Sequence, residues 1–234
     1  MQKRVLVIEN YNLSHYGVVG RALEDAGIQS DIRQMWAGAP LPEMSDGFDG
    51  LVVLGGEQSA VDDEKHPYLP ALANLMAEFG AQSKAVLGIC LGSQLLARAH
   101  GGQNLIGAAP EFGWQTVHLT EEGQRDPVLS SVTESFPIFQ WHDDTFTLPA
   151  DAVHLATNTT ATNQCFRIGR ASYGMQFHFE ANRSLVETWN KAFSSVIERK
   201  APDWLADYEH HAATAGVHAD VAGMAIAKAW VGMI

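Results

Sequence analysis

The chain has 234 residues, of which 46% are hydrophobic and 18% are charged, which is ordinary for a globular protein with a sizeable buried core. Its formal net charge of −12 at pH 7 argues against nucleic acid or an anionic membrane as a partner. Two cysteines, Cys90 and Cys165, are too few for the disulfide framework of a small secreted domain, so a cytoplasmic location is expected.

Neither end of the chain predicts export or membrane insertion. The apolar run Val5–Ile8 stops at Glu9, which is too short for the apolar core of a signal peptide. The apolar stretch 220–234 is interrupted by Asp220 and Lys228 and is too short to span a bilayer. We expect it to form a docking helix.

Short aliphatic runs alternate with helical patterns over the first hundred residues. This alternation is typical of parallel strands joined by helices that cover both faces of a sheet. Strands are predicted within 4–9, 30–36, 49–56 and 84–90, and helices within 16–27, 67–80 and 91–102.

From about Trp114 the pattern changes to closely spaced strands with little room for helices, which predicts an antiparallel excursion from the sheet. These strands are expected within 114–120, 136–142, 152–157, 164–169 and 172–179, followed by a helix over 183–199. The fold class is therefore α/β, with a mostly parallel sheet and a helical C-terminal tail. We expect one domain over residues 1–200 and a helical extension over 201–234 packed on it.

The stretch KAVLGICLGSQLLAR, residues 84–98, changes at Cys90 from a strand pattern to a helix pattern. A strand that enters a helix through a tight turn exposes the turn residue at the sheet edge, and Gly88 and Gly92 leave room for that turn. The helix start favours a thiolate, so Cys90 is a candidate nucleophile. The alternative is a small core cysteine, which the elbow context disfavours.

Backbone N–H groups near this elbow can stabilise an oxyanion. The Leu91 N–H points the same way as the thiol, and the Gly55-Gly56 loop ends the neighbouring strand.

The segment Tyr173–Glu180, YGMQFHFE, supplies a base and a group to orient it. Residues two apart on a strand face the same side, so His178 and Glu180 can touch while Phe177 and Phe179 face the other way. A metal site is a weaker interpretation because no third ligand is evident, and a structural histidine is the remaining alternative.

Other chemistry has little support in the sequence. Neither phosphate-loop nor dinucleotide-binding glycine motif is present, and His210-His211 are expected to be solvent-exposed rather than metal ligands. We therefore predict no cofactor and no metal.

Together, GICLGSQ at residues 88–94 and GMQFHFE at 174–180 resemble the class I (triad) glutamine amidotransferase family, in particular the amidotransferase half of GMP synthetase. The motif order also fits, with a Gly-Gly loop first and the segments EFGW and WHDDTFTLP between the elbow and the histidine. The similarity covers about residues 49–190.

The resemblance implies that Cys90 attacks the side-chain amide of glutamine, that His178 moves the protons and that Glu180 holds the imidazole. By the same resemblance, the oxyanion donors are the N–H groups of Gly56 and Leu91. The substrate contacts that it implies are Gln94, Trp141, His142 and Asp143, although residues 141–144 are equally well explained as a simple turn.

Three positions depart from the family pattern. Ser93 stands where many members carry His, Glu57 replaces a frequent Pro after the two glycines, and Phe179 stands where most members carry Pro. The loss of proline at Phe179 puts the placement of Glu180 in question.

The leading functional hypothesis is an amidotransferase-like hydrolase that releases ammonia from glutamine, with any ammonia-accepting synthetase on a separate chain. A γ-glutamyl peptidase or hydrolase can use the same triad on a larger γ-glutamyl compound. A catalytically silent regulatory module on the same fold is the third alternative.

Overall fold

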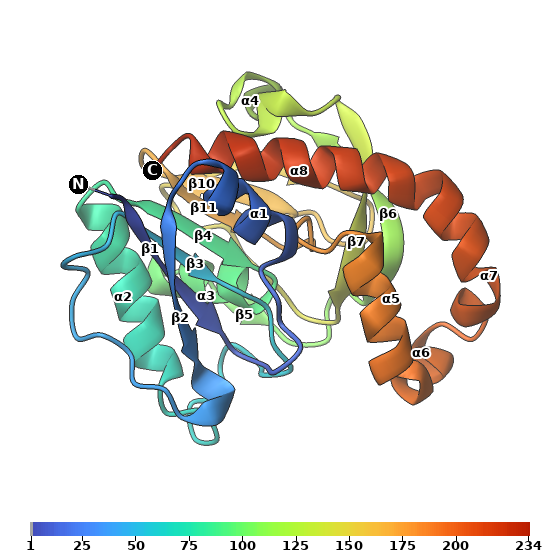
Figure 1. Ribbon diagram of the computed structural model, residues 1–234, viewed down its shortest axis with the longest axis horizontal. Coiled ribbons are helices and arrows are strands. Elements are labelled where there is room, and N and C mark those ends of the chain that lie inside the picture. The colour runs from blue at the N-terminus through green and yellow to red at the C-terminus, as the bar shows by residue number, and fades with distance from the viewer. Residues whose placement is uncertain (1) are drawn as a thin grey trace.

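A computed structural model describes residues 2–234 of the chain. Within these residues, nine strands form one sheet in the order β2-β1-β3-β4-β11-β10-β9-β6-β7 (Figure 1). The strands of the first half are β1 (Arg4–Glu9), β2 (Gln29–Gln34), β3 (Gly50–Val53) and β4 (Ala85–Ile89). Those of the second half are β6 (Glu111–Leu119), β7 (Ser135–His142), β9 (Val153–Thr157), β10 (Cys165–Ile168) and β11 (Ser172–Met175).

The first half of the sheet is parallel, and β11 pairs parallel with β4. Successive side chains of these strands alternate between two apolar clusters. On β1, for example, Val5 and Val7 join one cluster while Leu6 and Ile8 join the other. A strand buried on both faces needs this near-continuous apolar run, which is the pattern seen in the sequence.

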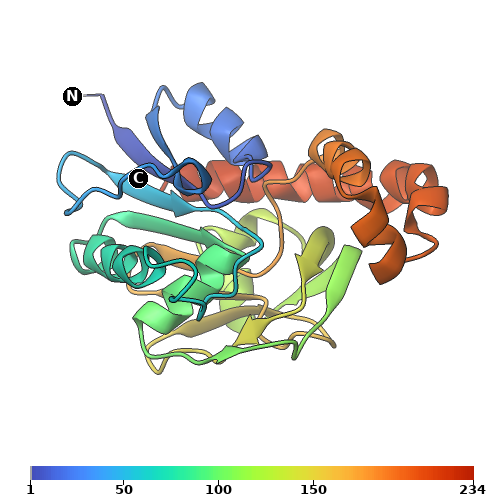
Figure 2. The ribbon, with the colours of Figure 1, turned by 90° about the horizontal axis from the view of Figure 1, so that it is seen from below.

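Helices cover both faces of the sheet. The first cluster includes residues of α1 (Gly17–Asp25) and α8 (Val217–Val231), and the second includes residues of α2 (Leu69–Ala81) and α3 (Leu91–Ala99). Figure 2 shows α8 running along the side of α1, away from α2. The predicted fold class is confirmed: the sheet is largely parallel, is helix-covered, and ends in a helical C-terminal stretch.

Strands β6, β7, β9 and β10 pair antiparallel, as the closely spaced strand signals predict. The short strands β5 (Asn104–Leu105) and β8 (Thr145–Phe146) form a separate pair. The prediction of one strand over 172–179 is wrong, because β11 ends at Met175. The chain then leaves β4 and makes a single antiparallel bridge between His178 and Phe139 of β7.

The remaining short elements connect these layers. They are the 3-10 turns η1 (Met35–Ala37) and η2 (Leu129–Ser131), the helix α4 (Glu121–Arg125), the helix α7 (Trp204–His211) and the π-helical turn η3 (Ala212–Gly216).

The single helix predicted over 183–199 is two helices, α5 (Arg183–Ala192) and α6 (Ser194–Lys200). They separate at Phe193, whose backbone departs from helical angles (φ −118°, ψ 22°). The break lets the Phe193 ring pack against Trp141 and Tyr11, at 5.3 and 5.9 Å between ring centroids. These helices lie with α7 at one end of the molecule (Figure 1).

The C-terminal stretch packs on the sheet rather than extending away from it. Trp230 of α8 is fully buried, and its indole N–H donates to the carbonyl of Val86 in β4 at 3.4 Å. In residues 2–234, none of the helices has the length and apolar character needed to cross a membrane.

Candidate active site

Cys90 lies at the turn between β4 and α3. Its backbone has φ 51° and ψ −109°, a region that residues with a side chain rarely adopt and that functional sites often retain. A Cβ on Gly88 would lie 2.3 Å from the Gly92 carbonyl oxygen, and one on Gly92 would lie 2.1 Å from the Val53 carbonyl oxygen. Both glycines are therefore required by close backbone packing, and the tight strand-to-helix elbow is present as predicted.

The Gly55-Gly56 loop follows β3 and borders the thiol. A Cβ on Gly55 would lie 3.0 Å from Cε1 of His178 and 3.4 Å from Cβ of Cys90, so both side chains converge on this glycine. The Ser14 hydroxyl donates to the Gly55 carbonyl at 2.8 Å and holds the loop.

Two N–H groups remain available near the thiol. Within residues 2–234, neither the Gly56 N–H nor the Leu91 N–H donates to another protein group. Leu91 is the first residue of α3, where N–H groups have no partner within the helix. Such unpaired donors can stabilise an oxyanion that forms beside Cys90.

His178 and Glu180 form a buried pair. The imidazole Nδ1 lies 2.6 Å from Oε1 of Glu180, and their side chains are 9% and 3% exposed. Burial lowers the pKa of His178, but the negative charges of Glu180 and of a Cys90 thiolate outweigh it and hold this pKa well above its ordinary value. The site therefore favours the protonated form of His178, which is the form that results when this imidazole takes a proton.

The missing proline at Phe179 is offset by packing around the backbone. The His178 N–H donates to the Phe139 carbonyl at 2.8 Å, and the Glu180 carbonyl accepts from the Val18 N–H at 3.0 Å. Phe179 itself is 1% exposed in the core. A Cβ on Gly223 of α8 would lie 2.3 Å from the Phe179 carbonyl oxygen, so α8 presses directly on this segment.

The other two departures also have identifiable surroundings. Ser93 is fully buried, and its hydroxyl donates to the Cys90 carbonyl at 2.7 Å, so its polar group is satisfied within the elbow. Glu57 is exposed and lines the cavity beside Cys90. The pKa of the nearby Tyr11 hydroxyl is raised by burial and by the negative charge of Glu57.

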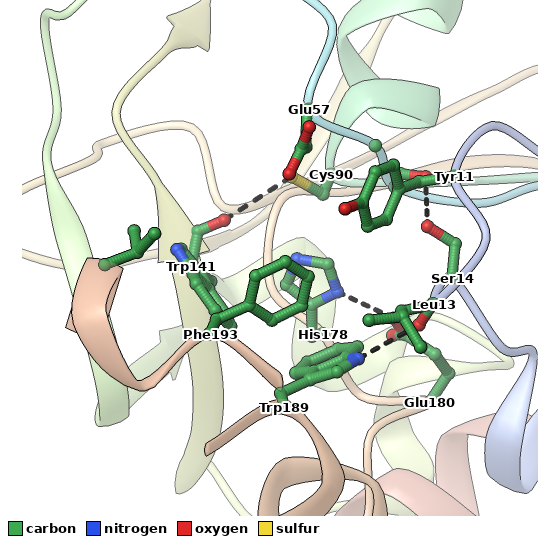
Figure 3. A pocket seen from close by; sticks show the side chains of 13 residues that line it. Tyr11, Leu13, Ser14, Glu57, Cys90, Trp141, His178, Glu180, Trp189 and Phe193 are labelled. Carbon is green, nitrogen blue, oxygen red and sulfur yellow. Dashed lines mark hydrogen bonds and ion pairs between the residues drawn. The ribbon is translucent and has the colours of Figure 1, made fainter. Parts of the chain in front are cut away.

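A cavity of about 220 Å³ joins these groups, and Figure 3 shows the His178 ring between Cys90 and Glu180. The elbow, the Gly55–Glu57 loop and the His178–Glu180 pair line it. The rest of the lining consists of Tyr11, Leu13 and Ser14 after β1, Trp141 at the end of β7, Trp189 of α5, Phe193 at the helix break and Val196 of α6.

The remaining predicted site residues lie around the turn that follows β7. The Cys90 thiol donates to the Trp141 carbonyl at 3.8 Å. Gln94 is buried, and its amide N–H₂ donates to the Asp144 carbonyl at 3.4 Å. The carboxylate of exposed Asp143 pairs with Lys200 at the end of α6. Neither Gln94, His142 nor Asp143 lines the cavity, whereas Trp141 does.

Several cavity residues are not identified by sequence reasoning. Tyr11, Leu13 and Ser14 lie in a polar turn that carries no motif. Phe193 lies at a helix break that no neighbouring glycine or proline predicts. Trp189 falls on the apolar face of an ordinary amphipathic helix, although its ring packs edge-on against His178 at 5.4 Å. Among residues 2–234, no cluster of three or more His, Cys, Asp or Glu side chains is arranged to hold a metal ion.

Comparison with known proteins gives the same family as the motifs. The family model described as glutamine amidotransferase class-I matches residues 6–189. The chain therefore belongs to the class-I glutamine amidotransferase family, which supports glutamine hydrolysis as its general chemistry.

Individual relatives cover most of the chain. The glutamine amidotransferase-like protein YfeJ of Salmonella typhimurium is 32% identical over 187 residues, which are 79% of this chain and 78% of that protein. One subunit of a glutamine-hydrolysing GMP synthase from Methanospirillum hungatei is 27% identical over 180 residues, covering 76% and 87%. A crystal structure of a glutamine amidotransferase from Thermotoga maritima is similar with a TM-score of 0.86 at 27% identity, covering 98% and 99%.

Proposed function

We propose that this protein hydrolyses the side-chain amide of glutamine through a thioester on Cys90. The observation that carries the proposal is the convergence of a strained cysteine elbow, a buried His178–Glu180 pair and two available N–H groups on one cavity. This set supplies the nucleophile, base, orienting carboxylate and oxyanion donors that amide hydrolysis requires.

In the first half of the reaction, His178 takes the proton of the Cys90 thiol, and the sulfur attacks the amide carbon. The new C–S bond places negative charge on the carbonyl oxygen, which the N–H groups of Gly56 and Leu91 stabilise. His178 then gives its proton to the amide nitrogen, the C–N bond breaks, and ammonia leaves. Glu180 keeps Nδ1 of His178 protonated, so that Nε2 exchanges the proton.

In the second half, water replaces ammonia. His178 takes a proton from the water, whose oxygen attacks the thioester carbon. The C–S bond breaks, the sulfur recovers a proton from His178, and glutamate leaves.

For substrate binding, Trp141 is the residue of the 141–144 segment that we expect to contact glutamine directly, because it lines the cavity. Gln94 and Asp143 act indirectly. Gln94 donates to the Asp144 carbonyl, and Asp143 pairs with Lys200.

Ammonia release from glutamine by the purified protein tests the proposal. Wild type should release ammonia and glutamate in equal amounts, and Cys90→Ala should release neither. A glutamine analogue with an electrophile at the amide position should label Cys90 and no other residue. A folded wild-type protein that neither turns over glutamine nor reacts with the analogue would instead favour a silent regulatory module.

An ammonia-accepting synthetase on another chain is the partner that we propose for this activity. The support is the similarity to one subunit of a GMP synthase, whose name implies that the enzyme has at least one more.

A γ-glutamyl peptidase is the second candidate, and the shape of the cavity favours it. Part of the cavity lining is apolar, with Leu13, Phe193 and Val196. Such a lining suits an apolar amine attached to the γ-glutamyl group better than it suits ammonia. A kcat/KM for γ-glutamyl dipeptides well above that for glutamine would favour the peptidase, and the reverse order would favour the amidotransferase.

A further inference from the structure

A buried polar network lies behind the turn that follows β7. The Glu111 carboxylate of β6 receives the Nε2 amide of Gln164 at 2.7 Å, the Nδ2 amide of Asn158 at 2.5 Å, and faces Nε2 of His142 at 3.2 Å. The side chains of His142 and Glu111 are 2% and 4% exposed. Gln164 in turn accepts from the Gln140 amide at 2.9 Å.

The geometry determines which nitrogen of His142 donates to the turn. Its Nδ1 lies 2.9 Å from the Asp144 carbonyl oxygen, which can only accept, so Nδ1 carries a proton. Its Nε2 lies 3.2 Å from the Glu111 carboxylate, which also accepts from the amides of Asn158 and Gln164. The ring therefore lies between the buried Glu111 carboxylate on one side and the Asp144 carbonyl on the other.

The turn that His142 holds borders the reacting thiol. The Asp144 carbonyl that accepts from His142 also accepts from Gln94 of α3. The carbonyl of Trp141, the residue before His142, accepts the Cys90 thiol. One imidazole therefore connects β6, the end of β7 and the helix that begins at the nucleophile.

We propose that His142 is a positioning residue: its Nδ1–H bond to the Asp144 carbonyl fixes the 141–144 turn, so that Trp141 shapes the cavity and its carbonyl stays against the thiol. This role rests on the proposed function and concerns substrate binding at the Cys90 site. His142 itself touches neither the cavity nor the triad. A loosened turn should therefore weaken substrate binding more than it slows the chemical steps.

Two substitutions separate this role from simple structural support. The amide of His142→Asn can take the place of Nδ1 and donate to the Asp144 carbonyl, but it leaves the buried Glu111 carboxylate without its contact to Nε2. The amide of His142→Gln reaches the Nε2 position and can donate to Glu111, but it leaves the Asp144 carbonyl without this donor. The Asn variant should therefore lose more thermal stability, and the Gln variant should lose more substrate binding.

Steady-state kinetics with glutamine and thermal unfolding of the same samples give the measurement. We expect His142→Gln to raise KM about tenfold with kcat within about threefold of wild type, and His142→Asn to keep KM within about twofold. If the Asn variant does not fold, Glu111→Gln replaces it, because the ring then keeps its bond to Asp144 and KM should again stay within about twofold. The proposal is wrong if KM follows the order of thermal stability, or if the Gln variant keeps the wild-type KM.

Alkylation of Cys90 tests the same role without any turnover. A carbonyl dipole directed at the sulfur disfavours the thiolate, so release of the Trp141 carbonyl should speed alkylation by iodoacetamide. We expect a rise of at least about threefold in His142→Gln and none in His142→Asn. If wild type has no activity on glutamine but the alkylation rates still follow this order, the proposed function fails and the positioning role stands. Equal alkylation rates in the two His142 variants would overturn the positioning role.

Discussion

Replacement of Gly92 by alanine tests whether the elbow geometry carries the activity. The new methyl group would lie 2.1 Å from the Val53 carbonyl oxygen and 2.9 Å from the Val53 carbonyl carbon. Neither of these backbone atoms can rotate away as a side chain can, because Val53 is held in β3 between two neighbouring strands. The start of α3 must therefore move by about 1 Å to restore an ordinary contact.

The expected effects on stability and activity differ strongly in size. Overpacking costs about 1–3 kcal/mol, and alanine recovers about 1 kcal/mol through its higher helix propensity. The net loss of about 1 kcal/mol should lower Tm by about 2–4 °C in a chain of this length. A displacement of about 1 Å at the nucleophile, however, should reduce kcat/KM by about 100-fold.

Thermal unfolding and ammonia release measured on the same samples provide the assay, with Gly80→Ala as the matched control. Gly80 is also helical, in α2, but a Cβ there would meet only the rotatable Ser172 hydroxyl at 2.8 Å. The control should keep wild-type activity, with a Tm that is unchanged or raised by the higher helix propensity of alanine. If Gly92→Ala retained wild-type kcat/KM while folded, the close approach of α3 to β3 would not be what positions Cys90.

Three further predictions concern the triad and the cavity wall. Burial and the negative charge of Asp126 raise the pKa of the fully buried Cys165 thiol. Iodoacetamide should therefore modify only Cys90 in the folded protein, which peptide mass analysis can measure. Modification mainly at Cys165 would contradict the assigned nucleophile. Because the folded-state pKa of His178 is raised above its unfolded value of about 6.5, its charge stabilises the fold fully below that pH, and this contribution is lost as pH rises through the folded pKa. Glu180→Gln should lower the pKa of His178 and flatten this loss in denaturant titrations at several pH values, whereas an unchanged pH profile would exclude the pair as its source. Phe193→Ala should reduce kcat/KM for γ-glutamyl amides of apolar amines about tenfold more than for glutamine, and equal losses on both substrates would remove the apolar wall as a specificity element.

The sequence alone was sufficient for the fold class and for the features that depend on local geometry. A cysteine between two glycines at the junction of a strand pattern and a helix pattern predicts an elbow. Such a tight turn needs glycine close to the cysteine in the sequence, so the requirement is visible in a few residues. The burial of the early strands on both faces is likewise visible, because short continuous apolar runs are typical of strands in a helix-covered parallel sheet. The order of the motifs then predicted the family, which the comparisons confirm.

Only the tertiary structure decided how the chain surrounds the elbow. The cavity unites Tyr11 with Trp189 and Phe193, residues that lie far apart in the chain and sit in patterns that equally describe ordinary surface turns and amphipathic helices. The placement of Glu180 without a preceding proline likewise depends on α1 and α8 pressing on its backbone. Contacts between distant segments depend on how whole layers pack, and no periodicity within a single segment encodes that packing.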